Sequence, residues 1–310
     1  MCVQKTERVR LLLINSVNRQ KLNRNRFFAL APGHADAQVW KNTYQSTWSD
    51  YDNDGDLDLW VCQYIVWNPD MDRKQDFTLT GGQRAYGRPT QFDGTFPVLY
   101  RNNGDQTFSD VSADMGVQVT DPQTNKPSAK SLGLSFADVD HDGWIDVLVA
   151  NDTVQNFLYA NRGPAKTKGK WSFEEISLSA EVAFSENGQP RSGMGVDAAD
   201  VFNRGYQDLF VANVDQEKFS LYQNQKNETF RDVARAHGVA QSTRLLSGWG
   251  LKFFDYDNDG NLDLILANGH PDDMIESYSP AVKHREPILL FQQQNGKLKD
   301  ISAEAGPVFQ

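Results

Sequence analysis

The sequence predicts an all-β fold, a β-propeller of four-stranded antiparallel blades with at least four blades visible. Three observations indicate it: an acidic nine-residue motif recurs, a short β-type run follows every copy, and an aromatic run, a turn and a further run come next. Such repeats are typical of blades packed around an axis, whereas a β-solenoid uses much shorter repeats. We expect the blades at about residues 40–120, 131–180, 192–240 and 247–305.

The acidic motif is D-x-D-x-D-G-x-x-D, and three intact copies begin at Asp50, Asp138 and Asp255. The runs that follow them are DLWVCQY, DVLVAND and DLILANG. They are rich in the aliphatic and aromatic residues that favour strands, and Cys62 in the first is expected to be a buried strand residue. Each motif is therefore expected to form a loop between two strands.

A fourth copy of the motif, followed by DLFVANV, is damaged. Asp200, Gly205 and Asp208 keep the first, sixth and ninth positions, but Phe202 and Arg204 occupy the third and fifth. A guanidinium group at the fifth position can neutralise the remaining carboxylates in place of a metal ion. The sequence thus predicts about three metal sites rather than four.

The clustered carboxylates of each intact loop require a counter-ion. Two like charges about 5 Å apart repel by roughly 3 kcal/mol at an effective dielectric near 20. The spacing fits Ca²⁺, because alternate acidic positions turn to one side, Gly permits a sharp bend and the seventh position offers a carbonyl. An EF-hand is excluded, since Val61, Val149 and Leu266 replace its twelfth-position Glu. The alternative is a polar turn that binds no ion.

The predicted calcium ligands occupy the odd positions of the three intact loops. They are Asp50, Asp52, Asp54, Asp56 and Asp58 in the first loop, Asp138, Asp140, Asp142, Trp144 and Asp146 in the second, and Asp255, Asp257, Asp259, Asn261 and Asp263 in the third. The expected role of calcium is mainly structural.

Two insertions and one leading segment fall outside the repeats. Residues 65–97 form an insertion in the first blade, and residues 270–287 form a smaller one in the last. Residues 1–39 form a basic, non-repeat segment, expected to be disordered or atypical, before a repeat region at 40–310. The apolar stretch at 11–14 is shorter than the roughly seven residues of a secretory signal, so we identify no signal peptide.

The first insertion is the expected ligand surface. It combines aromatic rings with guanidinium groups, a mixture suited to carbohydrates, carboxylates or protein hot spots. The alternative is a loop that only packs over the propeller. His270 joins the set because it follows a strand end at a loop-bearing face. The candidate residues are Trp67, Arg84, Tyr86, Arg88, Phe92 and His270.

Composition excludes several functional classes. The 310 residues carry a net charge of −10, and because residues 1–30 hold seven basic residues and one acid, the remainder carries −16. This acidity argues against nucleic acid as a partner. No apolar run approaches the roughly 18 residues of a membrane span. No metalloprotease, C-x-x-C, G-x-S-x-G or P-loop motif occurs, and a G-x-G-x-x-A match at 193–198 precedes a strand rather than a helix, so no catalytic residue is predicted.

The repeats resemble a known family. DxDxDGxxDLxVAN followed by LYxNxGxxxFxDV resembles the FG-GAP/VCBS repeat of integrin α-type propellers, and with the stretch FTLTGGQRAYGRP the chain is similar to the cartilage acidic protein and ASPIC/UnbV group over residues 45–306. The resemblance implies a calcium-loaded interaction module that is extracellular, periplasmic or on the cell surface. Members usually have seven blades, so this chain is expected to be either a fragment of a longer propeller or a smaller variant.

The leading functional hypothesis is a non-catalytic, calcium-binding propeller that acts as an extracellular binding or adhesion module for a protein or carbohydrate ligand. One alternative is a propeller-type carbohydrate-active enzyme, either a polysaccharide lyase or a hydrolase. Another is a lectin-like glycan-binding module. An enzyme should show a pocket with clustered ionisable groups and perturbed pKa values, and a binding module a shallow aromatic face.

Overall fold

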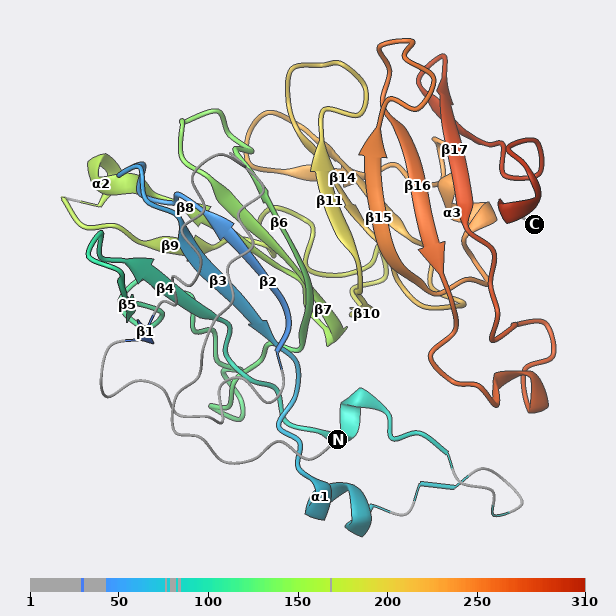
Figure 1. Ribbon diagram of the computed structural model, residues 1–310, viewed down its shortest axis with the longest axis horizontal. Helices are drawn as coiled ribbons and strands as arrows, with labels where there is room; N and C mark the ends of the chain where they lie inside the picture. The colour runs from blue at the N-terminus through green and yellow to red at the C-terminus, as the bar shows by residue number, and fades with distance from the viewer. Residues whose placement is uncertain are drawn as a thin grey trace, which may run out of the picture.

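The computed structural model describes residues 29–30, 43–75, 77–78, 82, 85–167 and 169–309. In this part of the chain four β-sheets lie side by side, and the helices are short (Figure 1). Each sheet contains four strands that are antiparallel and follow one another along the chain. The predicted all-β propeller fold with four-stranded blades is confirmed.

Each sheet is one blade. The first contains β2 (Thr43–Ser49), β3 (Asp58–Gln63), β4 (Val98–Asn102) and β5 (Thr107–Asp110). The second contains β6 (Ser131–Ala137), β7 (Asp146–Val154), β8 (Phe157–Asn161) and β9 (Phe173–Glu175). The third contains β11 (Val196–Ala199), β12 (Asp208–Val211), β13 (Ser220–Asn224) and β14 (Phe230–Asp232). The fourth contains β15 (Gly248–Phe254), β16 (Asp263–Asn268), β17 (Leu289–Gln294) and β18 (Lys297–Asp300).

Two short strands extend this pattern. β1 (Ala29–Leu30) pairs in parallel with β5, so two residues of the expected non-repeat segment belong to the first sheet. β10 (Arg191–Ser192) pairs with the end of β7 before the third blade begins. The sequence gives no sign of either pairing, because two-residue strands carry no detectable periodicity.

The helices lie in the connections between strands. They are α1 (Pro69–Lys74), α2 (Gly163–Lys166) and α3 (Val239–Ser242), with the short 3-10 helices η1 (Pro89–Gln91), η2 (Ile275–Ser277) and η3 (Pro307–Phe309). Asn68 caps α1 by accepting hydrogen bonds from two backbone N–H groups, and Pro69 occupies the first helical position. Among the described residues, no helix is long and apolar enough to cross a membrane.

The hydrophobic core lies between adjacent blades. Trp60 of β3 is fully buried, and its ring centroid lies 5.5 Å from those of Tyr159 and Phe173 in the second blade. Similar apolar clusters fill the spaces between the second and third blades and between the third and fourth. Face-to-face packing therefore explains why the second strands are apolar on both faces.

Glycine allows the first strands of neighbouring blades to approach each other. A Cβ atom at Gly133 would lie 2.2 Å from the carbonyl oxygen of Met194, and one at Gly195 would lie 2.0 Å from that of Trp249. No side chain fits at these distances. The glycine-containing runs before the second, third and fourth loops are thus packing features of the propeller.

The blades have two functionally distinct ends. Each acidic motif joins the first strand of a blade to the second, so all four motifs lie at one end. The insertions follow the second strands β3 and β16, and therefore lie at the other end (Figure 1). The antiparallel topology alone separates the predicted metal loops from the predicted ligand surface.

Candidate functional site

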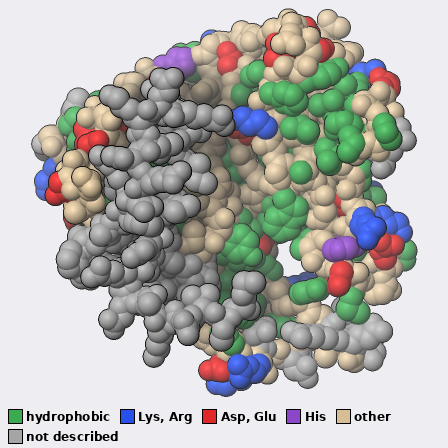
Figure 2. All heavy atoms as spheres, viewed as in Figure 1, with side chains coloured by type: hydrophobic (Ala, Val, Ile, Leu, Met, Phe, Trp, Pro, Cys, Tyr) green, Lys and Arg blue, Asp and Glu red, His purple; other side chains and the backbone are tan. Residues whose placement is uncertain are grey.

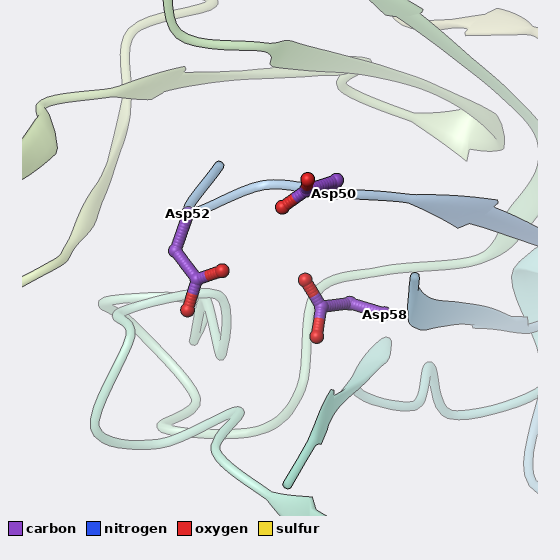
Figure 3. A group of neighbouring side chains, drawn as sticks. All are labelled: Asp50, Asp52 and Asp58. Carbon is purple, nitrogen blue, oxygen red and sulfur yellow. The ribbon is translucent and has the colours of Figure 1, made fainter. Parts of the chain in front are cut away.

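The three intact acidic motifs bring carboxylates together. Oxygen atoms of Asp50, Asp52 and Asp58 lie within 4.8 Å of one another, and the three side chains point toward a common centre (Figure 3). The other two groups are Asp138, Asp140 and Asp146, and Asp255, Asp257 and Asp259. An all-oxygen set of this kind fits a hard divalent cation such as Ca²⁺.

Backbone hydrogen bonds fix the first Asp of each loop. Asp50 accepts hydrogen bonds from the backbone N–H groups of Asp54 (3.0 Å) and Gly55 (2.9 Å). The bend that allows this needs a φ of +92° at Gly55, which favours glycine. The same pair of bonds reaches Asp138, Asp200 and Asp255 in the other copies. The loop geometry is thus prepared without a metal ion.

The ninth Asp of each motif connects the loop to its blade. In the first blade, Asp58 is fully buried and accepts hydrogen bonds from the backbone N–H groups of Tyr51 (3.2 Å) and Asn102 (2.8 Å). Asp146 and Asp263 accept the equivalent pairs of bonds. The ninth Asp therefore has a structural role besides any role as a ligand.

The carboxylates of the intact loops have raised pKa values. Burial raises the pKa of Asp58 and of Asp146 to about 7. Burial, followed by the charges of Asp54 and Asp50, also raises the pKa of Asp52. One carboxylate oxygen of Asp52 is buried and has no hydrogen-bond partner within the part of the chain that the structure describes. This orphaned acceptor in a ring of acids fits the coordination of a cation.

The second loop already contains a cationic side chain. Lys166 of α2 places its ammonium group 2.6 Å from Asp142 and 3.4 Å from Asp140. The lysine side chain is about half exposed, and exposed ion pairs contribute little free energy. A divalent cation could therefore displace Lys166, and we expect this loop to bind calcium more weakly than the first.

In the damaged motif an arginine forms an ion pair with the ninth Asp. The Arg204 guanidinium lies 2.5 Å from the buried carboxylate of Asp208 and donates a second hydrogen bond to the carbonyl of Asn224. Burial nevertheless raises the pKa of Asp208 to about 6, because it outweighs the arginine. The geometry agrees with the sequence-based hypothesis of an internal counter-ion.

Arg204→Ala is expected to lower the free energy of unfolding by about 2 kcal/mol, because Asp208 would remain buried without its cation. The calcium stoichiometry should stay at three, since Phe202 still blocks the third position. Chemical denaturation and a calcium titration measure the two quantities. Four equivalent sites in the wild-type protein would contradict the assignment of Arg204.

The predicted ligands divide into two sets. Nine carboxylates form the three groups, whereas Asp54, Asp142 and Asp263 are outside them. Asp54 and Asp142 accept hydrogen bonds from the N–H groups of the residues two positions later. The coordination by seventh-position carbonyls of Asp56, Trp144 and Asn261 stays a prediction.

A cavity of about 1000 Å³ occupies the end of the propeller opposite the acidic loops. The first insertion and the loop after β16 both line it, together with the starts of the first strands. Figure 2 shows this face hollowed between the insertions, with hydrophobic side chains around the opening. Arg88 is close enough to Tyr278 to lower its pKa, although burial and Asp272 raise that pKa to about 12.

The candidate ligand residues are placed unequally around this cavity. Tyr86, Arg88 and His270 line it, whereas Trp67 is exposed but does not. Phe92 is buried under the insertion near Phe77, with 6.4 Å between ring centroids. Burial excludes Phe92 from a ligand surface. Arg84 lies outside the described residues.

The sequence-based prediction missed most of the cavity wall. Two residues directly follow the second-strand run of each blade, at equivalent positions of the repeat. They are Tyr64 and Ile65 after DLWVCQ, Asp152 and Thr153 after DVLVAN, Val214 and Asp215 after DLFVAN, and Gly269 and His270 after DLILAN. Six of these eight residues line the cavity. Their shared position in the repeat could have identified them as cavity residues, because equivalent positions in successive blades converge on the propeller axis.

Hydrogen bonds join these residues across blades. The Tyr64 hydroxyl donates to Asp152 over 2.5 Å. His270 Nε2 donates a hydrogen bond to an Asp215 carboxylate oxygen (3.1 Å), and Nδ1 lies 3.1 Å from both the backbone N–H and the carbonyl oxygen of Asp272. Both nitrogen atoms of His270 are thus engaged within the protein.

Glu286 is a titratable group beside this network. Its carboxylate accepts a hydrogen bond from the Ser247 N–H (2.7 Å), but the second oxygen is buried without a partner. Burial raises the pKa of Glu286 to about 7. The folded protein therefore binds this proton more tightly than the unfolded chain, whose Glu pKa is about 4.3. The contribution of Glu286 to the free energy of unfolding is therefore fully present below the pKa of the unfolded chain, and it is lost as the pH rises through about 7.

Glu286→Gln is expected to remove this pH dependence. Relative to the wild-type protein, the free energy of unfolding of the variant should rise by about 1 kcal/mol between about pH 5 and about pH 8. This value is reduced for solvent screening, because Glu286 is only half-buried. Thermal melts at both pH values measure the difference. If the variant and the wild-type protein differ in stability by the same amount at both pH values, Glu286 is not the source of the pH dependence.

Comparisons with known proteins agree with this architecture. The FG-GAP-like repeat family matches residues 70–149, 138–211 and 200–266. Cartilage acidic protein 1 from Homo sapiens is 31% identical over 180 residues, which are 55% of this chain and 24% of that protein. The Mus musculus protein is 30% identical over 180 residues, 55% of this chain and 25% of that protein. The match spans about a quarter of the length of these relatives.

Two solved structures show a distant similarity to this chain. A rhamnogalacturonan lyase PL11 from Bacillus licheniformis gives a TM-score of 0.38 at 11% identity, over 83% of this chain and 50% of that one. A lectin from Agrocybe aegerita that recognises non-reducing terminal N-acetylglucosamine gives 0.37 at 15% identity, over 86% of this chain and 65% of that one.

Proposed function

Because this chain belongs to the FG-GAP-like repeat family, we propose that it is a calcium-loaded β-propeller that acts as a binding or adhesion module outside the cytosol. One observation carries the metal part of this proposal. Each of the three intact loops gathers three carboxylates within 4.8 Å, and among the described residues no cationic side chain forms an ion pair with a carboxylate of the first loop. Bound Ca²⁺ would remove that repulsion.

The ions would stabilise contacts between blades as well as single loops. Asn161 of the second blade donates a hydrogen bond to the Tyr51 carbonyl in the first loop (2.8 Å). Asn224 donates the equivalent bond to the second intact loop (2.8 Å), and Gln293 donates one to the damaged loop (2.9 Å), for which no ion is proposed. A metal ion that orders a loop therefore also orders the acceptor for the following blade.

The proposed location follows from calcium availability. Loops of this composition in extracellular modules bind Ca²⁺ with dissociation constants of about 10⁻⁴ to 10⁻³ M. Such sites fill at extracellular or periplasmic calcium concentrations and stay empty in the cytosol. A structural role for three ions therefore favours an extracellular, periplasmic or cell-surface location.

The cavity is suited to binding a ligand. Its lining combines aromatic rings with hydrogen-bonding side chains. The exposed aromatic rings around the cavity favour recognition of a ligand.

Melting of the protein with calcium and with a chelator tests the metal part of this proposal. A panel of immobilised proteins and glycans, probed with the calcium-loaded protein, tests the binding part. Turnover of a polysaccharide by the calcium-loaded protein would replace the binding module with an enzyme.

A further inference from the structure

We propose that the cavity at the end opposite the acidic loops binds a neutral glycan. This inference rests on the proposed binding function and gives that function a ligand class. Four aromatic side chains line the cavity and remain exposed: Tyr44 (62%), Tyr86 (61%), Tyr278 (52%) and Trp249 (40%). Large apolar groups gathered at one exposed site mark an interaction surface, and aromatic rings can stack on the C–H faces of sugars.

The polar groups of the cavity supply both donors and acceptors. Arg88 and Thr90 can donate hydrogen bonds, and Asp152, Asp215 and Asp272 can accept them. A polyhydroxylated ligand uses both kinds of group, because each hydroxyl donates one hydrogen bond and accepts others. An apolar ligand would leave these groups unpaired.

The carboxylates of the cavity do not require a cationic ligand. Asp215 accepts hydrogen bonds from His270 Nε2 (3.1 Å) and from the Gln216 amide (3.0 Å). Asp152 accepts a hydrogen bond from Tyr64; burial raises the pKa of Asp152, and this hydrogen bond and the charge of Lys130 oppose part of that rise. An ionised carboxylate offers about four acceptor positions, so each retains room for a ligand hydroxyl.

Asp272 also accepts hydrogen bonds within the protein and keeps acceptor positions for a ligand. It accepts hydrogen bonds from the Tyr278 hydroxyl and from the backbone N–H of Met274 (2.8 Å). With its charge stabilised by these donors, the carboxylate can accept a further hydrogen bond without ion pairing. The acidic residues can thus accept hydrogen bonds from the hydroxyl groups of a neutral ligand.

Thr153 provides an independent indication of a ligand. It lines the cavity with a φ of +60°, which is unusual for a β-branched residue. Its hydroxyl oxygen is buried and has no hydrogen-bond partner among the described residues. Strained residues with unpaired polar atoms are found where proteins clamp ligands.

The size of the cavity fits an oligosaccharide better than a single sugar. Its volume of about 1000 Å³ is at the upper end for a small-molecule site. It is bounded by loops from the first and last blades, so a longer ligand could continue between them. We therefore expect affinity to rise from monosaccharides to short oligosaccharides.

The test probes calcium-loaded protein with an array of neutral oligosaccharides bearing hexose, deoxyhexose and N-acetylhexosamine ends, beside acidic and sulfated oligosaccharides and a basic peptide. The protein should retain a neutral oligosaccharide, and Trp249→Ala or Tyr86→Ala should weaken this binding at least about tenfold. Trp67→Ala is the matched control, because Trp67 is 42% exposed but does not line the cavity.

Several results would overturn the inference. They are retention of only acidic oligosaccharides or the basic peptide, no retention of any neutral oligosaccharide, and equal loss in Trp67→Ala. Melting temperatures identify any variant that fails to fold, and Tyr86→Ala replaces Trp249→Ala in that case. If calcium stabilises the protein but no neutral oligosaccharide binds, the glycan inference fails and the calcium-loaded propeller stands.

Discussion

Removal of calcium is expected to lower the melting temperature by about 10 °C. At about 1 mM calcium and a dissociation constant near 10⁻⁴ M, each site contributes about 1.4 kcal/mol. Three sites then contribute about 4 kcal/mol, and each kcal/mol shifts the melting temperature of a protein of this size by about 2–4 °C. The physical source is the repulsion among the carboxylates at each loop, which the ions remove.

Circular dichroism melts in calcium and in chelator measure this shift. Magnesium at the same concentration is the control, because it prefers fewer protein ligands and retains more water. It should restore only a small part of the stability. Identical melting curves in calcium and in chelator would refute the metal assignment.

Asp58→Ala is expected to be the most damaging single substitution in the first loop, with a loss of about 3 kcal/mol in calcium. The change removes a calcium ligand and also leaves the N–H groups of Tyr51 and Asn102 without their acceptor. Because the second effect does not depend on the metal, a loss of about 2 kcal/mol should persist in chelator.

Asp52→Ala is the matched substitution in the same loop. One oxygen of Asp52 has no hydrogen-bond partner, so its removal should cost stability only when calcium is present. In chelator, Asp52→Ala should be neutral or slightly stabilising, since it relieves repulsion from Asp54 and Asp50. Urea unfolding of both variants in both conditions measures the difference. Equal losses in chelator would show that the two carboxylates have the same role.

The fold was predictable from the sequence because its signals are local and repeated. The D-x-D-x-D-G-x-x-D loops, the β-type runs and the turns each describe a few neighbouring residues, and their repetition indicates stacked units. The ion pair between Arg204 and Asp208 was also predictable, because both residues belong to one loop. The pairing of β1 with β5 was not, since it joins distant residues through a two-residue strand.

The cavity was only partly predictable. Tyr86, Arg88 and His270 stood out by residue type and by position in insertions. Tyr64, Asp152 and Asp215 did not, because each occupies an ordinary position after a strand. Phe92 was wrongly assigned to the ligand surface, because sequence does not distinguish an exposed aromatic residue from one buried under its own loop.

The sequence by itself determined the blades, the acidic loops and the end of each blade at which those loops lie, because short-range backbone geometry and strand order control all three. Only the tertiary structure decided which side chains meet around the axis. The reason is physical: those contacts depend on how far each blade rotates relative to its neighbours, and the close approaches at Gly133 and Gly195 set that rotation.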